Sequence, residues 1–542
     1  MNKKNIILLF SVLGLLIFFG CNDEDFLDRK PIDFLAPDNF KTEKDIKEAV
    51  NGIYASYISD KYEPIMSEFF TDNGFYVGYI DIWNRNFNSE TSFVETKWSR
   101  NYKIILRANT VLNYIDNVEL SEEQYNQYKG EATFLRAIAY FDLSEFYGGV
   151  PLRTKPESLA EADKPVTPLN EIVKFVLDEL EIASELLPVK YDASEKGRAT
   201  KGAALAMKAR VLLYNKYYEN AIEYCRKVKE LGLYSINKEY SSMFVTAGED
   251  TNTETIFDMQ FEQNQAAFGL SNNWTTVFKN WGGYQVLKNL EEEYYSINGL
   301  SIFDTNNSLY DPTVNTEIYK VTNLRNGLLD NRFTNRDPRL NYTLVVPYAI
   351  YTLSINDGLP VPYYPSAQRN ANFTGFKCRK YVDLSDGALN SISGVNPIII
   401  RYADILLMEA EALVELGEYD ETYVAGLINQ VRQRPDVMMP KVEDVEGTGL
   451  SQDEMRQIIR HERRVEFAFE GLRVFDIKRW NIGTDAYSDG RGYVTSLLTN
   501  GSANYVEHIY QPRTFDPSKG YLWPIPKSEA DSNAAIDESN IE

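Results

Sequence analysis

Hydrophobic residues recur at helical spacing through long parts of the chain. In residues 42–58, Ile46, Val50 and Ile53 share one helix face, and Thr42 precedes this stripe with Asp45 three residues later. The pattern predicts a helix that begins with a capping box. The same periodicity predicts three more long helices, at residues 92–115, 121–146 and 169–187.

Two further stretches predict pairs of helices joined by tight turns. The first pair covers residues 201–214 and 218–231, and the second covers 403–416 and 419–432 with Gly417 at its turn. Such pairs resemble tetratricopeptide units. Because no fixed period connects the two pairs, we expect a mostly α fold in which a helical scaffold carries insertions.

The segments between the helices differ from them in amino-acid composition. Residues 235–396 are rich in Asn, Thr, Gly, Tyr and Pro, with short strand candidates at 255–259 and 342–346. Residues 484–520 form a second irregular stretch. Long irregular stretches are uncommon in compact proteins and are often functional.

The first 25 residues have the pattern of an export signal. Lys3 and Lys4 precede an apolar run at residues 6–19, which is too short to span a membrane and has the length of a signal-peptide core. Gly20 and Cys21 follow directly. This predicts a lipoprotein signal peptide at residues 1–20, with acyl chains on Cys21 anchoring the mature protein. Ordinary secretion with a chance cysteine is the alternative.

Composition excludes several classes of function. The net charge of −23 disfavours binding to nucleic acid, because an acidic surface repels phosphate groups. The chain has three cysteines and two histidines, too few for a zinc site of the usual ligands. We therefore predict no metal site and no cofactor. Cys225 and Cys378 could form a disulfide or remain buried thiols.

No catalytic motif is present. The chain lacks a phosphate-binding loop, a dinucleotide-binding loop, a zinc-protease helix and a nucleophile elbow. His461 has no nucleophile pattern nearby, so we interpret it as a surface or packing residue. A glycosidase needs only two carboxylates, which composition alone leaves open. No pair stands out, since the acidic run at residues 291–293 has the pattern of a solvated helix face.

The densest charged pattern occupies residues 462–473. Glu462, Glu466, Glu470 and Arg473 fall on one helical face that hydrophobic residues flank. Carboxylates in such a position are partly buried and persist only if arginines pair with them. We therefore predict a structural ion-pair network that fixes the packing of the last helices.

Seven segments in order resemble the SusD/RagB family. The clearest are IIRHERRVEFAFEGLRVFDIKRW at residues 458–480, EATFLRAIAYFDLSEFYGGVPL at 131–152 and YLWPIPKSE at 521–529. The others lie at residues 39–54, 199–228, 336–340 and 401–412. The resemblance divides the chain into the signal peptide, an acidic tether at 21–38, an N-terminal helical region at 39–234 and a C-terminal region at 235–542, the last two packed as one unit.

This resemblance implies a function. Proteins of this kind are outer-membrane surface lipoproteins that capture oligosaccharides, or in some cases peptides. They form a lid on a TonB-dependent SusC-like barrel and carry no catalytic residues. The acidic run at residues 22–25 resembles the signal that exports such lipoproteins to the outer face of the membrane.

Ligand contacts are expected from aromatic residues in irregular segments, since sugar rings stack on flat aromatic faces. Two segments qualify, at residues 72–86 and 272–285. The candidate ligand-binding residues are Tyr76, Tyr79 and Trp83 in the first segment and Trp274, Trp281 and Tyr284 in the second. Packing of these rings inside the loops is the alternative. Trp98, Trp480 and Trp523 lie in scaffold motifs and are expected in the core.

Overall fold

The structure is a computed structural model. It describes residues 40–59, 65–76, 87–263, 265, 271–272, 274, 284–309, 319–320, 333–346, 350–353, 360–362, 374–383, 393–497 and 503–536. The chain is mostly helical, as predicted.

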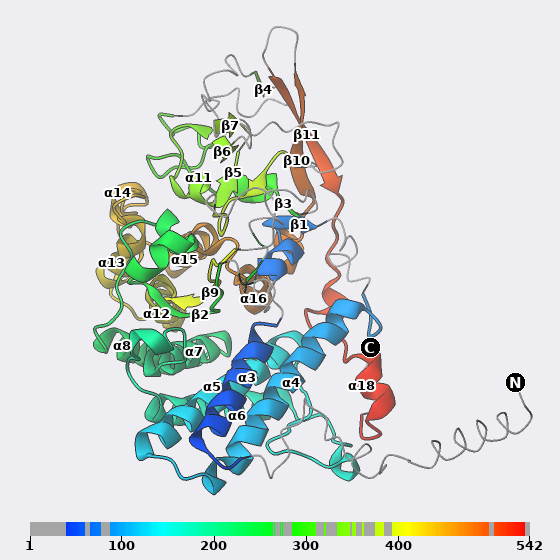
Figure 1. Ribbon diagram of the computed structural model, residues 1–542. Helices are drawn as coiled ribbons and strands as arrows, with labels where there is room; N and C mark the ends of the chain where they lie inside the picture. The colour runs from blue at the N-terminus through cyan, green and yellow to red at the C-terminus, as the bar shows by residue number, and fades with distance from the viewer. Residues whose placement is uncertain are drawn as a thin grey trace, which may run out of the picture.

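Helices from the N-terminal half pack side by side in the lower part of the molecule (Figure 1). They are α3 (Glu43–Tyr57), α4 (Ser92–Tyr114), α5 (Glu122–Tyr147), α6 (Leu169–Leu186), α7 (Lys201–Tyr214) and α8 (Tyr218–Glu230). Each lies within a residue or two of its predicted bounds. The capping box of α3 is confirmed, because the Asp45 amide donates to Thr42 Oγ1 and the Asp45 carboxylate accepts from the Thr42 amide.

The second predicted helix pair extends this arrangement. It consists of α12 (Tyr402–Leu416) and α13 (Glu421–Arg432), and α12 packs against α8. Gly417 between them has a φ of 81°, a conformation that favours glycine. The later helices α15 (Gln452–Phe467) and α16 (Arg473–Trp480) contain Glu462, Glu466 and Arg473. The single helical face expected for the charged segment is wrong, because Glu470 lies between the two helices, where Phe469 and Gly471 have positive φ angles.

Short antiparallel strand pairs lie mostly in the upper part of the molecule. They are β1 (Gly74–Tyr76) with β3 (Tyr284–Val286), β2 (Thr255–Asp258) with β9 (Ile398–Arg401), β5 (Leu344–Val345) with β8 (Lys377–Cys378), and β6 (Ile350–Leu353) with β7 (Pro360–Pro362). The exception is the pair of β2 and β9, which lies beside α7 and α12. The longest pair, β10 (Gly490–Leu497) with β11 (Ala503–Gln511), projects at the top of Figure 1 and also pairs with β4 (Tyr319–Lys320).

One expectation about the irregular regions is wrong, and another is confirmed only in part. Residues 484–520 contain the β10–β11 hairpin, whose strands read VTSL and NYVEHIY, rich in the β-branched and aromatic residues that strands favour. The strand expected at 342–346 covers only Leu344–Val345, because Arg339–Thr343 forms the short helix α11 after Pro338. Proline is well tolerated at a helix start, which explains the shift.

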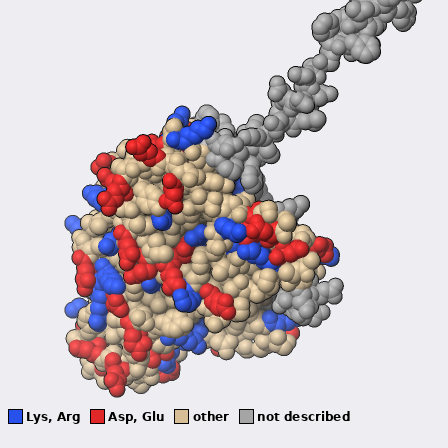
Figure 2. All heavy atoms as spheres, turned by 90° about the horizontal axis from the view of Figure 1, so that it is seen from below, with Lys and Arg blue, Asp and Glu red and all other residues tan. Residues whose placement is uncertain are grey.

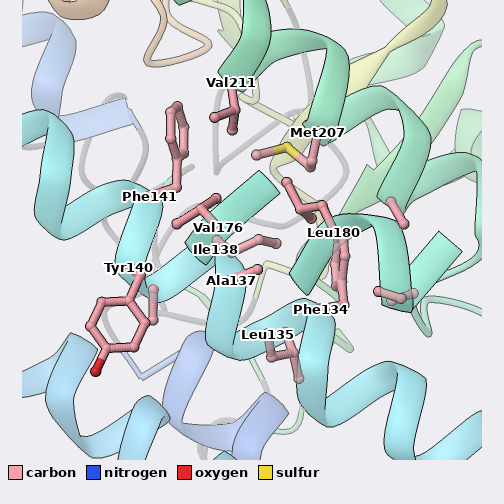
Figure 3. Close-up of a cluster of buried hydrophobic side chains, with 14 of the residues drawn as sticks. Phe134, Leu135, Ala137, Ile138, Tyr140, Phe141, Val176, Leu180, Met207 and Val211 are labelled. Atoms are coloured by element: carbon pink, nitrogen blue, oxygen red, sulfur yellow. The ribbon is translucent and has the colours of Figure 1, made fainter. Parts of the chain in front are cut away.

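The main hydrophobic core lies between the N-terminal helices. Figure 3 shows side chains of α5, α6 and α7 gathered in one cluster. Phe134 and Leu135 of α5, Val176 of α6 and Val211 of α7 are all buried there. Burying each such side chain contributes about 1.5–3 kcal/mol relative to leaving it exposed.

The predicted ion-pair network is confirmed and lies deeper than expected. The Glu466 carboxylate is fully buried and accepts hydrogen bonds from Arg339, Arg401 and Arg434 at 2.8, 2.7 and 2.8 Å. Arg401 also pairs with Glu470 at 2.7 Å. The network therefore joins α15 to α11, to β9 and to the segment that follows α13.

The acidic run at residues 291–293 is not the solvated helix face that we expected. Glu291 is fully buried and accepts a 2.7 Å hydrogen bond from Arg336. It ends the short helix α10 (Lys288–Glu291), which packs against β10. The partner arginine lies 45 positions away, so no local pattern indicates this burial.

Cys225 and Cys378 are both buried free thiols, which answers the question left open by the sequence. Burial raises the pKa of each thiol, so both resist ionisation.

Charged side chains of both signs intermingle over the face of the molecule seen in Figure 2. No helix of the described ranges is long and apolar enough to cross a membrane.

Candidate ligand-binding platform

Two of the six candidate residues meet at the β1–β3 pair. Tyr76 and Tyr284 lie directly opposite each other in the strand register. Their rings stack with centroids 4.2 Å apart and planes 9° from parallel. Tyr284 is buried and Tyr76 is partly exposed. We call this stacked pair, with the strands that hold it, the aromatic platform.

Further aromatic rings pack against the buried ring of the platform. The Tyr284 ring meets Phe69 edge-on at 5.2 Å, and Phe69 in turn contacts Phe469 at 5.5 Å. Gly74 permits this packing, since a Cβ atom there would lie 2.7 Å from the Phe69 ring and 3.2 Å from the Glu68 carbonyl oxygen. The stack therefore rests on a close approach of backbone to ring that only glycine allows.

An ion-pair cluster holds the strand segment that leads into β1. Asp72 accepts hydrogen bonds from Arg473 at 2.9 and 2.8 Å and pairs with Arg464 at 3.0 Å. Burial alone would raise the pKa of the Asp72 carboxyl, but the two guanidinium groups outweigh it and lower the pKa to about 2. Asp72 is therefore ionised and fully compensated at neutral pH.

Arg513 fixes the backbone of the same segment. Its guanidinium donates to the carbonyl oxygens of Thr71 and Gly74 at 2.8 and 3.0 Å. Burial lowers the pKa of Arg513 to about 9. Residues more than 390 positions away thus fix the position of the aromatic platform, and no local pattern in the sequence could have indicated them.

The remaining candidate residues have different outcomes. Trp274 was expected to be exposed, but it is only 1% exposed and packs edge-on against Tyr381 at 5.3 Å. It follows Asn272, whose backbone pairs with Ser393, so it anchors its segment to the core. Tyr79, Trp83, Trp281 and Cys21 lie outside the described residues.

The tryptophans of the scaffold motifs are placed largely as expected. Trp98 and Trp523 are buried in the main core. Trp480 is only partly buried, and the guanidinium groups of Arg460 and Arg479 lie 4.9 and 4.6 Å from its ring. The Trp480 ring therefore packs against two arginine side chains.

The chemistry around the platform suits binding. The nearby Asp72 is neutralised by arginines. His461 makes a 2.8 Å hydrogen bond with the Glu293 carbonyl oxygen and stacks on Tyr295 at 4.0 Å, as expected of a packing residue. Across the part of the chain that the structure describes, no group of three or more His, Cys, Asp or Glu side chains could hold a metal ion. Flat rings beside charge-compensated groups favour a ligand with apolar faces and neutral polar edges.

These features define a helical scaffold that presents a stacked pair of tyrosine rings, one of them partly exposed. The chain belongs to the SusD family: the SusD family profile matches residues 242–541, and a second profile, described as "starch-binding associating with outer membrane", matches residues 25–213. Proteins of this family bind ligands and are not catalysts.

Individual relatives cover nearly the whole chain. A SusD-like protein of Formosa agariphila, P38, is 29% identical over 88% of this chain and 92% of its own length. The crystal structure of a SusD-like carbohydrate binding protein from Bacteroides fragilis has a TM-score of 0.76 and 27% identity, and covers 91% of this chain and 99% of its own. A second SusD-like structure from the same organism has a TM-score of 0.77 and 26% identity, over 91% of this chain and 96% of its own.

Proposed function

We propose that this protein is a cell-surface lipoprotein that binds an oligosaccharide and delivers it to a TonB-dependent SusC-like transporter in the outer membrane. Family membership supports binding without catalysis. The signal pattern that ends at Cys21 supports a lipid anchor, and the acidic run at residues 22–25 supports export to the outer face.

The stacked pair of Tyr76 and Tyr284 carries this proposal. A sugar ring has an apolar face that packs on an aromatic ring and hydroxyl groups at its edge that seek polar partners. The partial exposure of Tyr76 places it at the outer edge of the platform. The charges around Asp72 are compensated within the protein, which favours a neutral ligand.

We infer that the binding surface continues into the segments on either side of the platform. Tyr79 and Trp83 follow Tyr76 in the chain, and Trp281 precedes Tyr284. These rings are proposed as further stacking contacts, and Trp274 as the buried anchor of the second segment.

The experiment is a binding screen with the purified chain. Calorimetry against plant, microbial and host oligosaccharides, and against peptides, would identify the ligand class. We expect Tyr76→Ala to weaken glycan binding by about tenfold, since an aromatic contact contributes roughly 1 kcal/mol beyond its buried area. Tyr217→Ala is the matched control, because Tyr217 is 48% exposed and belongs to the α7–α8 pair.

The outcomes separate the alternatives. Glycan binding that survives Tyr76→Ala, Trp83→Ala and Trp281→Ala would refute the proposed site. Binding of peptides alone would assign the platform to a peptide ligand. Release of shorter sugars during the titration would contradict the non-catalytic function and support a glycosidase.

The membrane anchor has a test of its own. We expect Cys21→Ala to abolish labelling of the protein with radioactive fatty acid, because Cys21 would carry the acyl chains. Cys225→Ala is the control. Because the Cys225 thiol is buried and should carry no acyl chain, its removal should leave the labelling of the protein unchanged. Labelling that persists in the Cys21→Ala protein would refute the anchor.

A further inference from the structure

A separate pocket lies at the junction of the N-terminal helices and the strands. It is formed by the segment at 189–200 that leads into α7, by the turn η8 (Thr246–Thr251) and by β2. Its volume is about 550 Å³, within the range of roughly 300–1,000 Å³ that small-molecule sites occupy. None of its lining residues belongs to the aromatic platform.

Carboxyl and amide groups converge on one side of this pocket. Gln260 Nε2 donates to Asp258 Oδ1 at 2.6 Å. The Glu249 carboxylate accepts from the backbone and side-chain amides of Asn396, both at 3.0 Å. These hydrogen bonds fix the orientation of four polar side chains before any ligand arrives, which lowers the entropic cost of binding.

Two tyrosines provide aromatic lining. Tyr191 lies on the segment before α7 and Tyr234 on the segment after α8. Tyr234 packs closely against Gly202, where a Cβ atom would lie 2.2 Å from the Tyr234 hydroxyl oxygen. Its hydroxyl lies 3.5 Å from Thr200 Oγ1. The ring is therefore held in place by the start of α7.

The ionisable groups of the pocket are close to neutral in sum. Burial raises the pKa of Glu249 to about 7 and that of Asp258 to about 6. Near neutral pH the two carboxyl groups can therefore donate as well as accept hydrogen bonds. Lys196 pairs with Asp250 at 2.9 Å, and Arg198 pairs with Glu131 at 2.9 Å, while Lys190, the third basic side chain of the lining, is exposed.

We propose that this pocket is a second binding site, for a neutral, hydroxyl-rich molecule of the size of a mono- or disaccharide. Mixed donors and acceptors beside aromatic rings match the edges and faces of such a ligand. Lys196 and Arg198 are engaged by carboxylates of the protein, and the one further basic side chain of the lining, Lys190, is exposed and shares the pocket with the acidic Asp192, Glu249 and Asp258, so the lining carries no excess of positive charge for an anion. The pocket does not depend on the aromatic platform, so its occupancy can be tested separately.

The test fills the pocket without removing a polar group. Ala193 lines the pocket and is exposed, so Ala193→Trp places a large side chain at the entrance. Ser194 is the neighbouring exposed residue and does not line the pocket, so Ser194→Trp is the matched control. The ligands are glucose, galactose, mannose, xylose, maltose, cellobiose and lactose at millimolar concentration, with saturation-transfer NMR as the measure of binding.

Hydrogen exchange of the same samples locates the site. We expect at least one sugar to protect the segments at 189–200 and 249–260, and Ala193→Trp to weaken its binding by at least about tenfold while Ser194→Trp leaves it unchanged. Gln260→Ala should weaken binding without blocking the entrance. The Tyr76→Ala protein should keep this protection, which separates the pocket from the platform.

Several results would overturn the proposal. Protection by these sugars confined to residues 65–76 and 284–290 would leave the platform as the site and remove the pocket. Binding unaffected by both Ala193→Trp and Gln260→Ala would do the same. Binding of glucosamine in place of all the neutral sugars would show that the two carboxylates recognise a cation, and would contradict a neutral ligand.

Discussion

Replacement of Glu466 by glutamine tests whether the buried charges determine the stability of the fold. Glu466 is fully buried on α15 and receives hydrogen bonds from Arg339, Arg401 and Arg434. Burial alone would raise the pKa of its carboxyl, but the three guanidinium groups hold the pKa well below its usual range. The substitution keeps the shape of the side chain and removes one negative charge.

The magnitude follows from the partners that remain. Arg339 keeps Glu462 at 2.6 Å, while Arg401 and Arg434 keep Glu254 at 2.5 and 2.7 Å. No guanidinium is therefore left without a carboxylate. Removing one partner from a buried ion pair costs about 3–5 kcal/mol. Because these partners remain, we expect a loss of about 3–4 kcal/mol, the lower part of that range.

The assay compares this variant with a matched exposed pair. Glu48→Gln on α3 removes the same charge from the Lys44–Glu48 pair, whose side chains are 79% and 65% exposed, and it should change stability only slightly. Guanidinium unfolding midpoints of the two variants and the parent protein give the comparison, since a chain of this length need not unfold in two states.

A pH series adds a second measure of the same network. A carboxyl whose pKa is lowered by folding stabilises the protein above its unfolded pKa, and this contribution is lost as the pH falls towards the lower folded value. The parent protein should therefore lose stability below about pH 4.5 more steeply than Glu466→Gln. Equal midpoints for Glu466→Gln and Glu48→Gln would refute the reasoning.

Two further predictions concern the platform and the pocket. Gly74→Ala should lower the free energy of unfolding by about 1–3 kcal/mol and weaken glycan binding, because the added methyl group would meet the Phe69 ring at 2.7 Å; unchanged calorimetric binding would contradict the role of this close approach. Since burial raises the pKa of Asp258 to about 6, folding favours its protonated form, and this stabilisation is lost as the pH rises from about 4 to 6. This pH-dependent part of the unfolding free energy amounts to at most about 3 kcal/mol and is reduced by solvent screening. Asp258→Asn should remove it, so the thermal midpoint of this variant should change less with pH over that interval, and an unchanged slope would contradict this.

The helices could be predicted because their signals are local. The hydrophobic stripe of α3 and its cap at Thr42 depend on residues within one or two turns, and the structure reproduces both. The end of α12 at Gly417 is equally local, since it needs only one residue in a left-handed conformation. Such rules operate within about four residues, so a single sequence contains all the information they need.

The candidate binding surface could be predicted only in part. Aromatic content indicated the two segments that contain Tyr76 and Tyr284, but their direct stacking depends on strand register across about 200 residues. Periodicity cannot distinguish a solvated acidic helix face from Glu291, whose arginine partner lies in another element. The burial of Trp274 likewise depends on Tyr381, about 100 residues further along the chain.

The segment that most resembles a family signature also supports the candidate site. Residues 458–480 supply Glu466 to the buried network and Arg464 and Arg473 to Asp72, beneath the platform. The same helices thus hold the scaffold together and orient the strand that presents Tyr76. Under the proposed function, this arrangement separates two tasks: buried charges fix where the aromatic platform lies, and the side chains around the platform determine which ligand binds. A scaffold of this kind can change its ligand through substitutions near the platform without disturbing the network that positions it.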